Sequence, residues 1–177
     1  MEKIVQDGDV VLREVANLVP EELFGTPALA RIIEQMKESL DPEVEGVALA
    51  APQIGVSYRI FIVRKDRTRI PPLPEEGAVR TPPPPENDVY INPEIIKTSR
   101  KKAAMDEGCL SVRGIYGTTM RHERVTIRAR AEDGSSFERG AGGLLAQIFE
   151  HEIDHLNGIL FIDHATHLVE ISHEHLS

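Results

Sequence analysis

The chain has 177 residues, of which 41% are hydrophobic and 28% are charged, so its composition is that of one globular domain and not of a disordered or membrane-spanning protein. It carries 20 Lys and Arg against 29 Asp and Glu, a net charge of −9, which argues against a protein built mainly to bind DNA. A single cysteine, Cys109, excludes an intramolecular disulfide and favours a reducing compartment.

The first half of the chain predicts one helix followed by extended segments. Residues 26–40 predict a helix, because Thr26 can cap its start and apolar side chains recur three and four positions apart. The run 59–63 is rich in β-branched residues and predicts a strand. Residues 89–97 predict two short extended pieces, because Pro93 has no N–H to donate to a strand partner.

The second half predicts a strand, a turn and a second helix. Residues 125–131 alternate apolar and polar side chains, which predicts a half-buried strand. Asp133 and Gly134 follow and predict a hairpin turn. Residues 143–157 predict a helix, and Gly158 is placed to end it.

Two further segments contribute no predicted helix or strand. Residues 70–88 contain seven of the chain's twelve prolines, which favours a solvated loop inserted within one domain. From about residue 164 the chain is a short polar tail with histidines at 164, 167, 173 and 175, which we expect to be solvated. We therefore expect a single domain over residues 1–177.

The sequence HEIDH, which starts at His151, carries the strongest chemical signal. His151 and His155 lie one helical turn apart on the same face, the spacing that two ligands of one metal ion require. Leu144 and Ile148 continue the same stripe, so we expect the histidines to point inward. Glu152 lies beside them, near enough to exchange a proton with a water molecule at the metal. The alternative is a surface helix that carries two histidines by chance.

A catalytic metal needs a third protein ligand. Phe161 stands where the metzincin motif has its third histidine, and a phenyl ring cannot bind a metal, so that class is excluded. Glu170 or Glu174 could serve in a zincin, but the tail is short and polar there. The remaining candidate is Cys109, whose thiolate would bind zinc or ferrous iron. Its alternative is a small buried apolar side chain.

Residues 46–56 form an apolar segment of small residues, broken by Pro52. Gln53 is its only side chain with a hydrogen-bonding group. In a dry pocket the Gln53 amide could stabilise an oxyanion. The alternative is a turn in the core with a surface glutamine.

These three segments, in this order, resemble the signature motifs of the peptide deformylase family. The family motifs G-x-G-L-A-A-x-Q, E-G-C-L-S and H-E-x-D-H read here GVALAAPQ (46–53), EGCLS (107–111) and HEIDH (151–155). The similarity spans about residues 4–163. The chain departs from the family pattern at Ala48, where the family has its second glycine, and at Arg113, where many members have proline.

The resemblance implies an α+β fold, with antiparallel β-sheets around a central metal-binding helix, in a single catalytic domain. It implies one divalent metal ion, Fe²⁺ by family resemblance with Zn²⁺, Ni²⁺ or Co²⁺ as alternatives, held by Cys109, His151 and His155. It assigns acid–base catalysis to Glu152, and polarisation of the formyl oxygen to Gln53 and the backbone N–H of Leu110. The implied substrate-binding residues are Gly46, Val47, Ala48, Glu107, Gly108, Leu144 and Ile148.

The resemblance also implies the reaction, which is removal of the N-formyl group from the formyl-methionine of newly synthesised polypeptides, with release of formate. The implied partners are N-formyl-methionyl nascent peptides, without DNA or membrane, in a bacterial-type cytoplasm or an organelle matrix. Basic clusters at 64–69 and 100–102 are interpreted as solvated faces, with a transient ribosome contact as the alternative. The alternative function is a metalloamidase of different substrate choice or an inactive deformylase-like binding protein.

Asp154 lies near the ligand face of the predicted helix, slightly to one side. We predict that it orients the site through a basic partner, either Arg121 or Arg124. The alternative is an ordinary surface charge.

Overall fold

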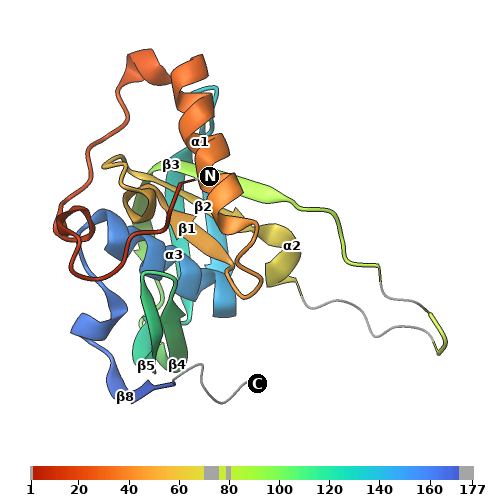
Figure 1. Cartoon of the computed structure of the whole chain (residues 1–177), viewed down its shortest axis with the longest axis vertical. Helices are drawn as coiled ribbons and strands as arrows, with labels where there is room; N and C mark the ends of the chain where they lie inside the picture. The colour runs from red at the N-terminus through yellow and green to blue at the C-terminus, as the bar shows by residue number, and fades with distance from the viewer. Residues whose placement is uncertain (1, 70–75, 79–80, 172–177) are drawn as a thin grey trace.

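Figure 1 shows the computed structural model of the chain, which describes residues 2–69, 76–78 and 81–171. Parts of the predicted proline-rich loop, at 70–75 and 79–80, and the tail histidines at 173 and 175 lie outside these residues. In the part of the chain that is described, no helix is long and apolar enough to span a bilayer.

The strands form two antiparallel sheets. The five-stranded sheet has the order β1-β2-β3-β6-β7, and the three-stranded sheet has the order β4-β5-β8. The strands of the larger sheet are β1 (Ala48–Ala50), β2 (Ile60–Arg64), β3 (Asn87–Thr98), β6 (Arg124–Arg130) and β7 (Ser136–Gly142). Those of the smaller sheet are β4 (Lys102–Cys109), β5 (Val112–His122) and β8 (Thr166–Glu170). The helices are α1 (Pro27–Leu40), α2 (Lys65–Thr68) and α3 (Gly143–Leu156), with short 3-10 helices at Val10–Arg13, Glu21–Leu23, Ala51–Ile54 and Phe161–Asp163.

Both faces of the five-stranded sheet are buried at β2, which explains why that strand is apolar along most of its length. Phe61 and Val63 belong to a core that they share with α3, whereas Ile60 and Ile62 belong to a second core that they share with α1. Successive side chains of a strand point to opposite faces. The sheet therefore lies between the two helices, with α3 at the centre of the molecule beside β4 and β5 (Figure 1).

Helix α1 confirms the predicted helix and its cap. The Leu29 N–H donates to Thr26 Oγ1 at 3.3 Å, and Pro27 occupies the first turn, where its missing N–H costs nothing. Ile33 and Met36 are buried on the face turned to the sheet. Local signals were sufficient here because the cap and the apolar stripe lie within one segment.

Gly158 ends α3 as predicted, and the structure shows why no other residue would serve. Its φ is +74°, and a Cβ atom there would lie 2.5 Å from the carbonyl oxygen of Arg13. The N-terminal segment therefore passes directly over the end of α3, where Arg13 also pairs with Asp163 at 2.6 Å.

Strand β3 corrects the prediction of two separate extended pieces. It is one strand with register shifts after Ile91 and after Ile95. Asn92 has a φ of +50°, and its side chain both accepts from and donates to the backbone of Val19, at 2.9 and 3.0 Å. Pro93 therefore causes an irregularity within the strand and does not divide it.

Several other elements differ from the sequence-based expectation. Strands β4 and β5 were not predicted, although they make up most of the smaller sheet. Strand β8 lies within the predicted polar tail and pairs with β5.

The interpretation of the 64–69 cluster as a solvated face is wrong for Arg64, whose side chain is 5% exposed and forms an ion pair with Asp66.

Candidate active site

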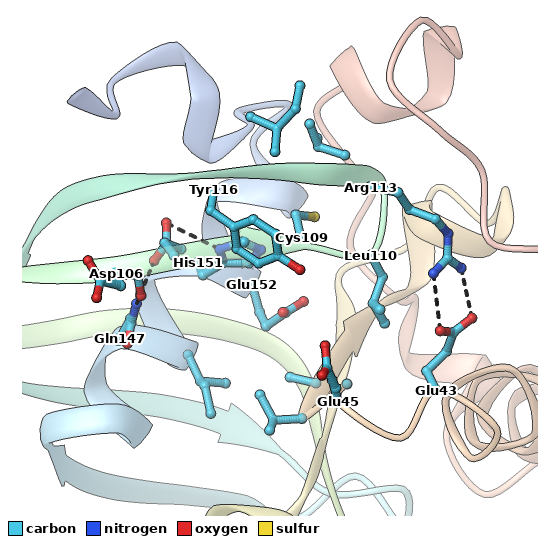
Figure 2. Close-up of a pocket in the computed structure, with 18 of the residues that line it drawn as sticks. Glu43, Glu45, Asp106, Cys109, Leu110, Arg113, Tyr116, Gln147, His151 and Glu152 are labelled. Carbon is cyan, nitrogen blue, oxygen red and sulfur yellow. Dashed lines mark hydrogen bonds and ion pairs between the residues drawn. The ribbon is translucent and has the colours of Figure 1, made fainter. Parts of the chain in front are cut away.

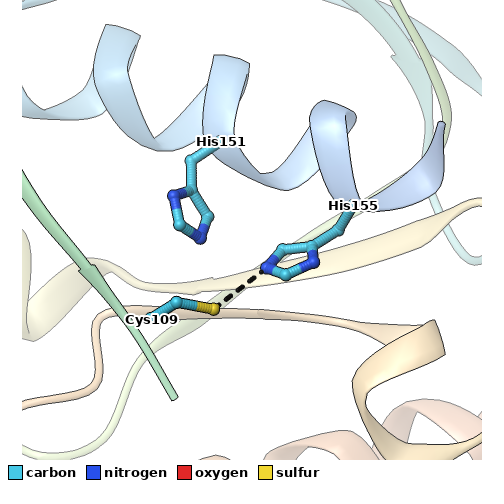
Figure 3. Close-up of side chains that lie close together, drawn as sticks. All are labelled: Cys109, His151 and His155. Carbon is cyan, nitrogen blue, oxygen red and sulfur yellow. Dashed lines mark hydrogen bonds between the residues drawn. The ribbon is translucent and has the colours of Figure 1, made fainter. Parts of the chain in front are cut away.

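The hairpin of β4 and β5 brings Cys109 against two histidines of α3. Figure 3 shows His151 and His155 on successive turns of the helix, with Cys109 facing both. Their ligand atoms all lie within 4.8 Å of one another, and Cys109 Sγ is 3.3 Å from His155 Nε2. One thiolate and two imidazoles form a donor set that suits Zn²⁺, Fe²⁺, Co²⁺ or Ni²⁺. The three residues therefore fit a divalent metal ion.

Glu107 contacts the His151 ring at Nδ1 and orients it. Its Oε2 lies 3.4 Å from His151 Nδ1, which leaves Nε2 for the ligand cluster. Burial raises the pKa of Glu107, but its bonds with His151 and Arg121 outweigh burial and lower the pKa to about 2. Glu107 is therefore ionised at neutral pH and favours an Nδ1–H tautomer of His151.

Arg121 links the Glu107 carboxylate to Asp154 of α3. Its guanidinium contacts Glu107 at 2.6 Å and Asp154 at 2.8 Å, and its side chain is buried. Asp154 was predicted to have a basic partner, and Arg121 is that partner. The other candidate, Arg124, instead donates its backbone N–H to Ser99 Oγ.

Glu152 is buried beside the cluster and faces the cavity. Glu152 is 4% exposed, and its Oε2 has no hydrogen-bond partner among the residues that the structure describes. Burial raises the pKa of Glu152 to about 7. A buried carboxyl oxygen without a partner is costly, so this position needs an explanation other than stability.

Gln53 is buried, and its amide is oriented toward the cluster. Its Oε1 accepts the Ala50 N–H at 2.9 Å, which requires the amide nitrogen to face the other way. That nitrogen donates to Ser111 Oγ at 3.1 Å and lies 3.8 Å from Cys109 Sγ. The alternative of a surface glutamine is therefore wrong.

A cavity of about 510 Å³ opens over these groups (Figure 2). It is lined by every predicted catalytic and substrate-binding residue and by two of the three predicted ligands, namely Gly46, Val47, Ala48, Gln53, Glu107, Gly108, Cys109, Leu110, Leu144, Ile148, His151 and Glu152. His155 lies behind this lining and is fully buried. The expectation that the histidines point inward is confirmed, since the side chain of His151 is 11% exposed and His155 is buried, whereas Leu144 at the start of α3 is 45% exposed.

Several lining residues were not predicted from the sequence. The ring of Tyr116 packs directly against Gly108. A Cβ atom on residue 108 would lie 2.8 Å from that ring. Gln147 lines the cavity and donates to Glu107 at 3.2 Å. The sequence offers one signal for β5, because Ile115, Tyr116, Thr118 and Thr119 are β-branched or aromatic residues of the kind enriched in strands.

The comparisons with known proteins agree with this site. A family model described as "Polypeptide deformylase" matches residues 1–170. The chain belongs to the peptide deformylase family. Its deformylase relatives include one from Carboxydothermus hydrogenoformans, 39% identical over 94% of this chain and 95% of the relative. Another, from Halothermothrix orenii, is 42% identical over 92% of each chain.

A solved structure of the family superposes on most of the chain. The Met-Ala-Ser-bound class I type b peptide deformylase from Acinetobacter baumannii has a TM-score of 0.75 and 31% identity, and the match covers 92% of this chain and 97% of that one. These matches confirm the predicted family, the α+β fold with antiparallel sheets, and the predicted class of metal-dependent hydrolase.

Proposed function

We propose that the cavity over Cys109 binds formyl-methionyl peptides and that Glu152 carries out the proton transfers that release formate. The observation that carries this proposal is the unpartnered Oε2 of Glu152, buried beside the Cys–His–His cluster. A group of this kind is available to a water molecule and a substrate atom in the cavity, because no protein donor competes for it.

Cys109, His151 and His155 would hold one divalent metal ion. When bound, the ion supplies a Lewis acid that promotes ionisation of water and polarises a carbonyl oxygen. Glu107 holds His151 in a suitable orientation, and Arg121 holds Glu107 in turn. This chain of contacts explains why the buried charges of Glu107 and Arg121 lie behind His151.

Glu152 accepts a proton from the water that attacks the formyl carbon, and it returns a proton to the amine nitrogen as the C–N bond breaks. The Gln53 amide and the Leu110 N–H donate to the formyl oxygen while that oxygen gains negative charge. The bond between Gln53 and Ala50 holds the amide in place before substrate arrives. Such preorganised donors lower the barrier without reorganising during the reaction.

The methionyl residue would lie between β1 and α3. Gly46, Val47 and Ala48 lead into β1, an edge strand whose free side can pair with an extended peptide. Leu144 and Ile148 supply an apolar wall for the methionine side chain, and Glu107 and Gly108 line the same cavity. The binding of Met-Ala-Ser by the Acinetobacter relative supports a peptide in this position.

The two alternatives are a metalloamidase with another substrate and a binding protein without turnover. We would measure formate and amine release from formyl-Met-Ala-Ser, acetyl-Met-Ala-Ser and formyl-Ala-Ala-Ser, using protein loaded with Ni²⁺ under anaerobic conditions. We expect rapid release from the formyl-methionyl peptide alone. Turnover of the acetyl peptide would indicate an amidase, and peptide binding without any release would indicate the binding protein.

We assign Fe²⁺ as the physiological metal on the family resemblance, since the thiolate and imidazole donors suit Fe²⁺ but also Zn²⁺, Co²⁺ and Ni²⁺. A thiolate that loses its metal is open to oxidation. Protein purified anaerobically should therefore contain iron and lose activity in air faster than the Ni²⁺ form. Zinc as the only metal recovered from anaerobic cells, with undiminished activity in air, would contradict the assignment.

We place the protein in the cytoplasm of a bacterial cell, with transient contact to the ribosome where nascent peptides emerge. The exposed residues Arg100, Lys101 and Lys102 form the candidate contact surface. Co-sedimentation with ribosomes should be lost when the three are replaced by Glu and when salt is raised. Binding that survives both changes would exclude this surface.

A further inference from the structure

The loop between α1 and β1 forms one wall of the cavity. Glu43, Val44, Glu45 and Gly46 all line it. Val44 is 83% exposed, so apolar burial does little to hold the loop in place. Its own backbone contributes a turn in which the Gly46 N–H donates to the Glu43 carbonyl at 2.8 Å. A binding surface with so few internal contacts needs an external support.

Arg67 of α2 provides that support through the carbonyl oxygens of the loop. Its Nη1 donates to the carbonyls of Glu43 and Gly46 at 2.7 and 2.8 Å. Its Nη2 donates to the Asp41 carbonyl at 2.7 Å. The side chain is only 18% exposed. A single guanidinium thus connects the end of α1 to Gly46, the first residue of the proposed substrate-binding stretch.

Helix α2 is itself held firmly, although it has only four residues. Arg64 pairs with Asp66 at 2.8 Å and with Asp41 at 2.7 Å. The Lys65 N–H donates to the carbonyl of Glu86 at 2.9 Å, which ties α2 to the segment that leads into β3. The backbone of α2, which carries the Arg67 side chain, is therefore held in place by contacts with other segments.

The opposite side of the loop is held by a second arginine. Arg113 of β5 forms a two-bond ion pair with Glu43, at 2.7 and 3.1 Å, and Figure 2 shows this pair at one end of the cavity. This pair fixes a side chain, whereas Arg67 fixes the backbone. The two contacts together leave the loop little freedom.

We infer that Arg67 is a positioning residue, which holds the 41–46 loop in the form that binds the peptide. The inference rests on the proposed function, because it concerns the same cavity. Arg67 contacts backbone carbonyls that lie outside the Cys–His–His cluster and Glu152, so it acts on substrate binding and not on the chemical step. Without it the loop samples other conformations, and only a fraction of the protein binds substrate at any time.

The test compares Arg67→Met and Arg67→Lys with the parent, all loaded with Ni²⁺ and assayed on formyl-Met-Ala-Ser. We expect KM to rise by about tenfold or more in Arg67→Met, with kcat changed by less than about twofold. Arg67→Lys keeps the charge with one donor nitrogen and should give an intermediate KM. Amide hydrogen exchange should accelerate at 43–46 in both variants, and the metal content should equal that of the parent.

Arg69→Met is the matched control, because Arg69 is 60% exposed and contacts Glu86 at 3.5 Å, away from the loop. It should leave KM and exchange unchanged. An active parent whose KM and loop exchange are unaltered by both Arg67 substitutions would overturn the inference. A parent that releases no formate would contradict the proposed function instead, and loop exchange would then decide the inference alone. If Arg67→Met fails to fold, Arg67→Lys gives the decision by the same two measurements.

Discussion

Gln53, which we propose takes part in catalysis, also satisfies two buried polar groups. Its proposed role toward the formyl oxygen predicts that its removal lowers the rate. The structure predicts a loss of stability as well, because Gln53 is 2% exposed and satisfies both the Ala50 N–H and Ser111 Oγ. Truncation leaves the Ala50 N–H without its acceptor in a buried site.

We therefore predict two effects for Gln53→Ala. The value of kcat should fall by about 100-fold, since one oxyanion donor is lost. The free energy of unfolding should fall by about 1–3 kcal/mol, because a buried backbone donor loses its partner. Steady-state kinetics and urea denaturation measure the two effects. Parent-like kcat in a destabilised variant would show that Gln53 is structural only.

Ala48 illustrates a departure from the family pattern that the fold accommodates. Its methyl group occupies space that a glycine would leave free. The residue is 8% exposed and belongs to the core that β2 shares with α3, although it also lines the cavity. Much of the added methyl surface is therefore packed into the protein.

At the scale of elements, α3 and the β4–β5 hairpin meet through Arg121. This side chain bonds Glu107 on the hairpin and Asp154 on the helix, so it links the element that carries Cys109 to the one that carries both histidines. Loss of one partner of a buried ion pair leaves the other charge uncompensated. The geometry of the Cys–His–His cluster therefore depends on this link.

We predict that Asp154→Asn weakens metal binding by about 10–100-fold while the fold is retained. The amide removes the charge opposite Arg121 without changing the size of the side chain. Competition with a chelator measures the metal affinity, and circular dichroism reports the fold. An Asn variant that retains its metal as well as the parent would show that the hairpin and helix are held together by other contacts.

The ion pair between Arg64 and Asp66 at the start of α2 should make the stability of the protein depend on pH. The hydrogen bond from Arg64 lowers the pKa of Asp66 to about 2 from its ordinary value of 3.8. A carboxyl group with a lowered folded-state pKa stabilises the protein above its unfolded-state pKa, and this contribution is lost as pH falls toward the folded value.

The free energy of unfolding of the parent should therefore decline between about pH 5 and pH 2. In Asp66→Asn this component of the decline should be absent, so the two curves should converge as pH falls. Urea denaturation at several pH values, with chelator present, tests this. A constant difference between parent and variant across the range would contradict a titration of Asp66.

At the scale of the whole molecule, the sequence predicts elements whose signals are local. The helices at 26–40 and 143–157 and the strands at 59–63 and 125–131 match α1, α3, β2 and β6 to within one or two residues at each end. Each has a cap, a stop, a periodic apolar pattern or a run of β-branched residues within its own length. The three signature motifs were also local, and their residues come together in one cavity.

The elements and contacts that escaped prediction depend on distant parts of the chain. Strand β8 is exposed along its length and exists through its pairing with β5, some fifty residues earlier. Arg121 has no local pattern that identifies it, because its partners lie 14 and 33 residues away. The support of the 41–46 loop by Arg67 likewise joins segments more than twenty residues apart. Pairings of this kind are set by topology, which single-segment patterns do not contain.

The most direct test of the account concerns Glu152. We would compare formate release from formyl-Met-Ala-Ser by the parent and by Glu152→Gln, each loaded with one equivalent of Ni²⁺. The Gln side chain has nearly the same shape but cannot accept and return a proton, so kcat should fall by about 100-fold to 10,000-fold at equal metal content. A Gln variant that carries the same metal and releases formate at the parent rate would contradict the central claim that this buried carboxyl group transfers the protons.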